Sequence, residues 1–236
     1  MVSRRQGVSV MARSRATTPL KRDSVRSRER ILAAALLEFS EHGLAGARVD
    51  RIAQRAQINK RMLYSYFGAK NELYSEVMRR RFALRAAQLD LATYSAPEES
   101  TAFWFQFGCR DRAWVRLLEW EALDATATRM IARSQRKRCY DRAIGQFAGF
   151  QRARQLPSDL DPRMLLLSNM ALTTFPLAFP QLTRLITGAS PGDSRFQARW
   201  TAFVRAMIRR LKPVAPPVFE GRRKASRRYA SPEARV

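Results

Sequence analysis

The chain has 236 residues, with 44 Lys or Arg and 20 Asp or Glu, which gives a formal net charge of +24 at pH 7. Its length allows one or two domains, and its 46% hydrophobic content excludes a disordered basic tail protein. A chain this basic is expected to meet phosphate groups or an anionic membrane surface.

The same composition argues against most catalytic chemistry. His42 is the single histidine, and Cys109 and Cys139 stand thirty positions apart without a histidine nearby. A structural zinc site cannot be built from these residues, and a Ser-His-Asp triad would have to use His42. We therefore expect no catalytic residue and no metal site. His42 is interpreted as favoured by the dipole at the end of a helix, and the cysteines as small core residues.

No segment predicts a membrane or secretory role. The longest apolar stretch, residues 165–179, is too short and too polar to span a bilayer, and the N-terminus lacks an apolar leader. The expected location is the cytoplasm, in association with the nucleoid, and no membrane partner is expected.

Residues 1–26 and 213–236 are basic and lack apolar periodicity, which predicts a disordered basic arm and a disordered basic tail. Met11 remains an alternative start to Met1.

Between these ends the apolar residues recur with helical spacing, and no run alternates as a strand would, so the prediction is an all-α fold. The first helix is expected to start after an N-cap at Ser27 and to stop at Gly43. Further helices are predicted at about 49–56, 60–67, 69–93, 98–108, 110–123, 125–154, 161–187 and 194–212.

The second and third predicted helices are both about eight residues long, and Gln57 and Ile58 join them. This is the spacing of a helix-turn-helix. Asn59 is expected to cap the third helix, with Leu63 and Phe67 pointing inward. Its outer face is then Lys60, Arg61, Met62, Ser65 and Tyr66. A short helix with cations at its N-terminus is suited to insertion into the major groove.

Residues 28–77 resemble the N-terminal DNA-binding domain of TetR-family transcriptional regulators. The resemblance includes an Ala-Ala pair in the first helix, Phe39, Gly43, Val49-Asp50, Ile52-Ala53, Ala56, Leu63-Tyr64, Tyr66-Phe67-Gly68, Lys70 and Leu73. It implies a three-helix DNA-binding domain over 27–75. A helical ligand-binding and dimerisation domain over 76–212 would follow.

The resemblance also implies roles for individual residues. Lys60, Arg61 and Met62 match base-reading positions, and Tyr64, Ser65 and Tyr66 match phosphate-facing positions. Lys70 matches a phosphate clamp at the start of the fourth helix. Arg48 matches a phosphate contact that is often Thr, so the usual N-cap is missing. Gln57 stands where the family often has Gly, and a left-handed conformation there would cost about 1 kcal/mol.

For the body, the resemblance implies an apolar effector cavity between the middle helices. The candidate pocket residues are Phe103, Phe107, Trp114, Leu118, Phe147, Met170 and Phe175. The candidate homodimer interface is the apolar stripe of the last predicted helix, with part of 161–187. The stripe consists of Trp200, Phe203, Val204, Met207 and Leu211.

These observations predict a sequence-specific DNA-binding transcriptional regulator that binds a palindromic operator as a homodimer. Its expected partners are double-stranded DNA, a second copy of the chain and a small-molecule effector, with no cofactor. A ligand-responsive repressor is the preferred interpretation, although the residues do not distinguish it from an activator. The alternative is a sequence-neutral architectural or nucleoid DNA-binding protein, which the charge would suit. An enzyme is disfavoured, since the chain has no Gly-rich phosphate loop.

Overall fold

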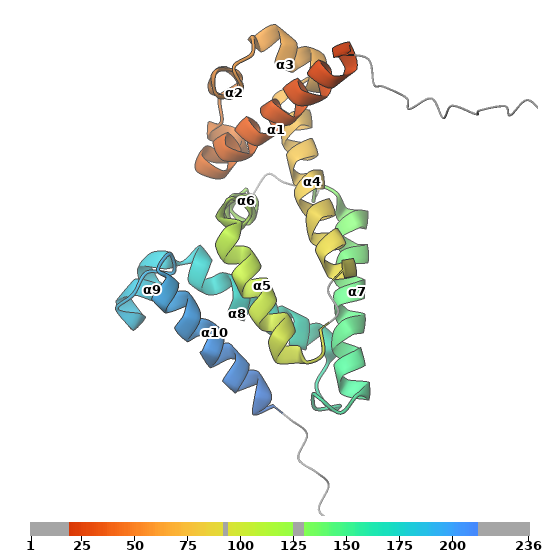
Figure 1. Ribbon diagram of the computed structural model, residues 1–236, viewed down its shortest axis with the longest axis vertical. Coiled ribbons are helices and arrows are strands. Elements are labelled where there is room, and N and C mark those ends of the chain that lie inside the picture. The colour runs from red at the N-terminus through yellow and green to blue at the C-terminus, as the bar shows by residue number, and fades with distance from the viewer. Residues whose placement is uncertain (1–18, 92–93, 125–129, 212–236) are drawn as a thin grey trace, which may run out of the picture.

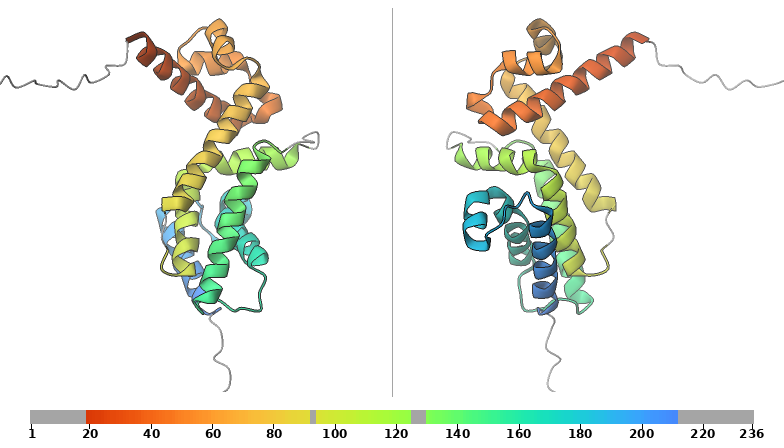
Figure 2. Two further views of the ribbon diagram at one scale, coloured as in Figure 1. Left: turned by 90° about the vertical axis from the view of Figure 1, so that its right-hand side faces the viewer. Right: turned by 60° about the vertical axis from the view of Figure 1, so that its left-hand side comes forward.

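The computed structural model describes residues 19–91, 94–124 and 130–211, and within these ranges it contains ten helices and no strand. The all-α prediction is confirmed. Helices α1 (Pro19–Gly46), α2 (Val49–Ala56) and α3 (Lys60–Phe67) form a small lobe at one end of the molecule (Figure 1). Helix α4 (Lys70–Leu91) runs from this lobe into a larger body (Figure 2). Among the described helices, none is long and apolar enough to cross a membrane.

The body consists of helices α5 to α10. Their bounds are α5 Pro97–Arg110, α6 Arg112–Leu123, α7 Arg133–Arg152, α8 Pro162–Ala178, α9 Pro180–Thr187 and α10 Ser194–Arg209. Helix α5 packs against both α8 and α10, and α7 packs against α4 and α8. Asp161 caps α8 by accepting a hydrogen bond from the backbone N–H of Arg163 at 2.7 Å, as its position before Pro162 favours.

Helix α1 begins at Pro19, eight residues before the predicted N-cap, so Ser27 lies inside the helix and does not cap it. The part of the predicted arm at 19–26 is therefore helical, whereas residues 1–18 lie outside the described residues. Residues 19–26 carry no apolar stripe to reveal a helix, but no glycine interrupts them. Ion pairs to α4 hold the next turn, from Arg28 to Glu76 at 3.0 Å and from Glu29 to Arg80 at 2.7 Å.

Two other predicted helices have different bounds. Of the segment predicted at 125–154, the structure describes residues 130–154, and within them the helix runs from Arg133 to Arg152, because Ala132 and Arg154 both take a positive φ. The helix predicted at 161–187 is divided into α8 and α9 at Phe179. The residue that follows is Pro180, which has no N–H to donate and disfavours helical geometry in the residue before it. The predicted tail at 213–236 lies outside the described residues.

One buried core joins the small lobe to the body. It contains Phe39, Ile52 and Leu63 of the lobe, Leu73 and Phe82 of α4, and also Trp114 and Leu117 of α6. The rings of Phe82 and Trp114 meet edge to face with their centroids 4.6 Å apart. The domain boundary predicted between residues 75 and 76 falls inside α4, and this core continues across it. Helix α4 is therefore shared by both parts.

Candidate DNA-binding site

The turn between α2 and α3 is closed by the backbone. Gln57 is left-handed, at φ 52° and ψ 49°, and its N–H donates to the carbonyl of Gln54 at 3.0 Å. The N–H of Ile58 donates to the carbonyl of Ala53 at 3.1 Å, which completes a Schellman motif at the end of α2. Arg30 of α1 donates to the carbonyl of Gln57 at 2.9 Å, so the left-handed residue is also held from α1.

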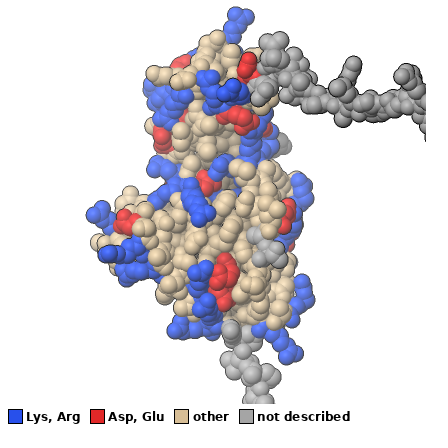
Figure 3. Space-filling view, viewed as in Figure 1, with Lys and Arg blue, Asp and Glu red and all other residues tan. Residues whose placement is uncertain are grey.

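Helix α3 has the N-cap and the inward residues that the sequence predicts, but Tyr64 takes the place of Tyr66 on its exposed face. Asn59 Oδ1 accepts a hydrogen bond from the N–H of Met62 at 2.7 Å, and Leu63 and Phe67 are buried in the core. The opposite face exposes Lys60, Arg61, Met62, Tyr64 and Ser65. Figure 3 shows Lys and Arg side chains spread over this lobe, with acidic side chains between them. The outer face of α3 is therefore free to enter a groove.

The two tyrosines have different surroundings. Tyr64 is 44% exposed, whereas Tyr66 is half-buried and packs against the core. The ring of Tyr66 lies with its centroid 6.3 Å from that of Phe67.

Lys60 forms an ion pair of 2.8 Å with Asp50 of α2, which raises the pKa of Lys60. Binding of a base or phosphate by Lys60 would have to replace this exposed contact.

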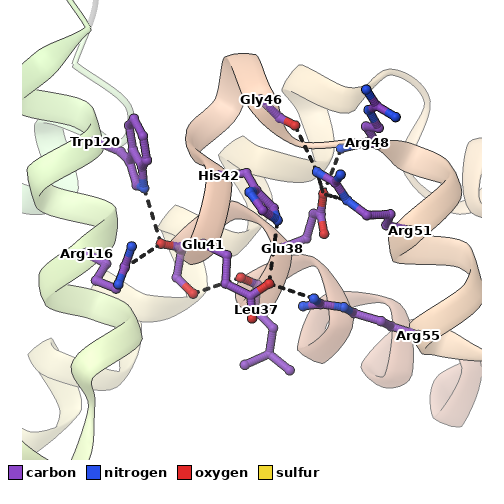
Figure 4. Close-up of polar contacts among 11 residues, drawn as sticks. Leu37, Glu38, Glu41, His42, Gly46, Arg48, Arg51, Arg55, Arg116 and Trp120 are labelled. Carbon is purple, nitrogen blue, oxygen red and sulfur yellow. Dashed lines mark hydrogen bonds and ion pairs between the residues drawn. The ribbon is translucent and has the colours of Figure 1, made fainter.

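Arg48 lies at the start of α2 in an extended conformation, and its side chain does not cap the helix. The sequence predicts this, because Arg stands where the family often has Thr. Its backbone N–H instead donates to Glu38 Oε1 at 2.9 Å. The same oxygen accepts from Arg51 Nε at 2.7 Å (Figure 4). Glu38 of α1 therefore sets where α2 begins, while the guanidinium of Arg48 remains exposed.

Glu38 was not among the predicted site residues. Its side chain is 0% exposed. Burial acts to raise its pKa, but hydrogen bonds from Arg51 and from the N–H of Arg48 outweigh burial and hold the pKa below its usual value. The available signal was a carboxylate on the buried face of the first helix, next to Phe39, because a charge is seldom placed there without a partner.

Glu38, Glu41 and His42 lie close enough together to hold a metal ion. Both carboxylates already have cationic partners, because Arg51 binds Glu38 and Arg55 binds Glu41, in each case at 2.6 Å. A cation would have to displace these guanidinium groups. The cluster is better described as an ion-pair network between α1 and α2.

Lys70 is the first residue of α4, as predicted, and its ammonium group lies against the end of α1. Nζ donates to the carbonyls of Ala47 at 3.1 Å and Ala45 at 3.3 Å. An ammonium group has three donors, so one is left for a phosphate oxygen. Glu72 caps the helix start by accepting from the N–H of Ala69 at 2.7 Å.

A cavity of about 120 Å³ lies between helices α4 to α8 in the body. Trp114, Leu118, Phe147 and Met170 line it, as four of the candidate pocket residues. The other three do not, and here the sequence-based assignment is corrected. Phe103 and Phe107 stack on each other outside the lining, and Phe175 is exposed and packs on Phe179. Helical spacing places aromatic residues on a face without showing which helix covers that face.

Three of the candidate dimer residues pack against other parts of the same chain. Val204 is 0% exposed, and Met207 packs against the core around Phe147 and Ile208. Trp200 stacks on Phe196, and its indole N–H donates to the carbonyl of Leu172 at 3.1 Å. Only Phe203 and Leu211 of the stripe are exposed, so this assignment is corrected. Helix α5, which packs along α10, therefore meets part of the stripe that seemed to require a second chain, and α8 accepts the hydrogen bond of Trp200.

Two family profiles match the chain. Residues 31–77 match the profile described as bacterial regulatory proteins, tetR family, and residues 100–210 match the tetracyclin repressor-like C-terminal domain. The HTH-type transcriptional repressor SCO4008 of Streptomyces coelicolor is 29% identical over 178 residues, which cover 73% of this chain and 88% of that protein.

Solved structures show the same fold. The transcriptional regulator SCO4942 of Streptomyces coelicolor aligns with a TM-score of 0.63 and 25% identity, over 79% of this chain and 98% of that one. FadR of Bacillus subtilis, solved with stearoyl-CoA, aligns with a TM-score of 0.56 and 13% identity, over 76% of this chain and 98% of FadR.

The fold and the exposed helix of the lobe thus define a helix-turn-helix transcriptional regulator that binds DNA. The chain belongs to the TetR family.

Proposed function

We propose that the chain is an effector-responsive, non-catalytic repressor that binds a palindromic operator as a homodimer at the nucleoid. The observation that carries the DNA-binding part is the outer face of α3, where Lys60, Arg61 and Met62 are exposed directly after the Asn59 cap. Buried Leu63 and Phe67 fix the helix behind them. In helix-turn-helix proteins, residues at this end of the second helix reach base edges.

A set of exposed apolar side chains on α8, α9 and α10 supports a homodimer. Its members are Met164, Leu167, Phe175, Phe179, Leu182, Leu185, Ile186 and Phe203. Exposed apolar surface on this scale marks an interface more often than a free surface. We therefore move the proposed interface from the stripe of α10 to this set, keeping Phe203. A two-fold dimer would offer two copies of α3 to half-sites about one helical turn apart.

The cavity next to α4 supports effector control. Three residues of α4, Phe82, Arg85 and Leu89, line it, and the same helix starts at Lys70 beside α3. FadR, which shares this fold, was solved with a bound ligand. An effector acts only if it binds one position of α4 more tightly than the other.

Selection of bound sequences from random DNA tests this proposal. The full chain should enrich a short inverted repeat, and nuclease protection should cover both half-sites against excess random DNA. Recovery of DNA without a common sequence would instead support the architectural alternative. The position of the selected repeat relative to a promoter, together with transcription in vitro, separates repression from activation.

A further inference from the structure

The effector cavity carries an unbalanced positive charge. Among the described residues that line it, Arg85 is the only one with a formal charge at neutral pH, and no Asp or Glu is present. Its other polar lining residues are Ser100, Tyr140, Gln146, Asn169, Thr173 and Thr174. The side chain of Arg85 is only 14% exposed, and a cation with so little contact with water requires a counterion.

The counterion that the described residues offer to Arg85 is shared. Asp111 lies 3.8 Å from Arg85 Nη1, and it also contacts Arg81 more closely. The same carboxylate accepts the N–H of Trp114 at 3.3 Å, as the N-cap of α6. The guanidinium groups of Arg81 and Arg85 therefore share one carboxylate, which leaves a net positive charge at the cavity wall.

The guanidinium of Arg85 is also held in place. It lies 4.5 Å from the ring centre of Trp114 and 4.8 Å from that of Phe107. Nη1 is buried and has no hydrogen-bond partner among the described residues, and the same holds for Ser100 Oγ. Burial lowers the pKa of Arg85 to about 10, which means that the charge of Asp111 does not fully offset the loss of water around the guanidinium. The group is still charged at neutral pH.

The size and walls of the cavity limit the rest of the ligand. A volume of about 120 Å³ is close to the roughly 150 Å³ of an engineered cavity that holds benzene. Phe82, Trp104, Trp114 and Phe147 line it and offer aromatic faces and edges. A single planar ring fits this space.

We propose that the effector is a small planar carboxylate with one ring, which binds with its carboxylate on Arg85 and its ring among these aromatic side chains. This inference rests on the proposed effector control. A bound carboxylate would compete with Asp111 for Arg85 and weaken the contact between α4 and the start of α6. The effector thus acts on the helix that leads to α3.

Benzoate and its neutral isostere benzamide test the ligand class on the full chain without DNA. Calorimetry and the fluorescence of the cavity tryptophans measure binding. Benzoate should bind at least about tenfold more tightly than benzamide, because a charge-assisted hydrogen bond to a buried guanidinium adds that much. Arg85→Gln should abolish this preference, and Arg85→Lys should restore part of it.

Arg79→Gln is the matched control, since it removes an exposed guanidinium from the same helix outside the cavity lining and should keep the preference. Equal binding of benzoate and benzamide, an undiminished preference in Arg85→Gln, or no binding of benzoate at millimolar concentration would each overturn the proposal. Operator binding is measured separately on the same proteins. A chain that selects an operator but does not bind benzoate refutes the ligand class and leaves DNA recognition standing.

Discussion

At the scale of single residues, Lys60, Arg61 and Lys70 are expected to differ in what they recognise. The first two lie exposed at the start of α3, whereas Lys70 is tied to the end of α1. Lys60→Ala or Arg61→Ala should cost about 1–3 kcal/mol of binding and relax the preference at one base pair of each half-site. Quantitative binding to an operator and to its single-base variants measures both effects.

Lys70→Ala should instead weaken binding to all sequences similarly and reduce its salt dependence, as the loss of a phosphate contact does. Because Lys70 also holds carbonyls of α1, thermal unfolding of the variant is the control. A sequence-selective loss with Lys70→Ala, or a uniform loss with Arg61→Ala, would contradict these roles.

Glu38 should determine how the stability of the lobe depends on pH. Its pKa is lower in the folded chain than its ordinary value of 4.5. The ionised carboxylate therefore stabilises the fold above about pH 4.5, and this contribution is lost as the pH falls through the lower folded pKa. Glu38→Gln should lower the free energy of unfolding by about 2 kcal/mol at neutral pH, with a smaller difference in acid.

Glu41→Gln is the matched control for Glu38→Gln. Glu41 lies one turn further along α1 and pairs with Arg55, but its side chain is 44% exposed. Exposed pairs contribute little to stability. Urea unfolding at several pH values should therefore separate the two variants, and similar pH profiles for both would refute a special role for Glu38.

At the scale of elements, Gly43 interrupts α1 where α6 packs against it. Its φ of 64° and ψ of −178° depart from helical values, and an added Cβ would lie 2.8 Å from Cδ2 of Trp120. Trp120 and Arg116 both donate to the carbonyl of Ser40, at 3.2 and 2.9 Å (Figure 4). This joint connects the DNA-binding lobe to the body.

Gly43→Ala should therefore destabilise the chain by about 1–3 kcal/mol, through the positive φ and the clash with Trp120. Gly145→Ala on α7 is the control, because its added Cβ would meet nothing within 4 Å. That substitution should be neutral or slightly stabilising. Chemical unfolding of both variants provides the comparison, and equal stabilities would show that the joint accommodates a side chain.

At the scale of the whole molecule, the exposed apolar residues of α9 and α10 should control the oligomeric state. Leu185 is 82% exposed and Phe203 is 52% exposed, so a charge at either position can be solvated in a monomer. Leu185→Glu and Phe203→Glu should give folded monomers with much weaker operator binding, since a dimer engages two half-sites together. Light scattering after gel filtration measures the mass.

Leu84→Glu on α4 is the control, because Leu84 is also exposed but lies outside this set. It should leave the dimer intact. Trp200→Glu is not a useful interface variant, since Trp200 is half-buried against Phe196 and would lose internal packing. Unchanged dimers in both Leu185→Glu and Phe203→Glu would place the interface elsewhere.

The sequence by itself determined the features that depend on short-range order. Helical spacing predicted the all-α fold, Asn59 predicted the start of α3, and Asp161-Pro162 predicted the start of α8. Most of the outer face of α3 was also predicted, because the period of a helix and the inward positions of Leu63 and Phe67 fix which side chains remain outside. Tyr66 is the exception, since it packs against the core while Tyr64 is exposed.

Only the tertiary structure decided the features that depend on which helix covers which. The stripe of α10 predicted a surface for a second chain, but α5 packs along α10, and Trp200, Val204 and Met207 are partly or fully buried within the same chain. The cavity excluded Phe103 and Phe175 and brought in Arg85, which is separated by 26 residues from the Asp111 that it shares with Arg81. Periodicity shows that a face is apolar, whereas burial, ion pairing and desolvation depend on the partner that meets it.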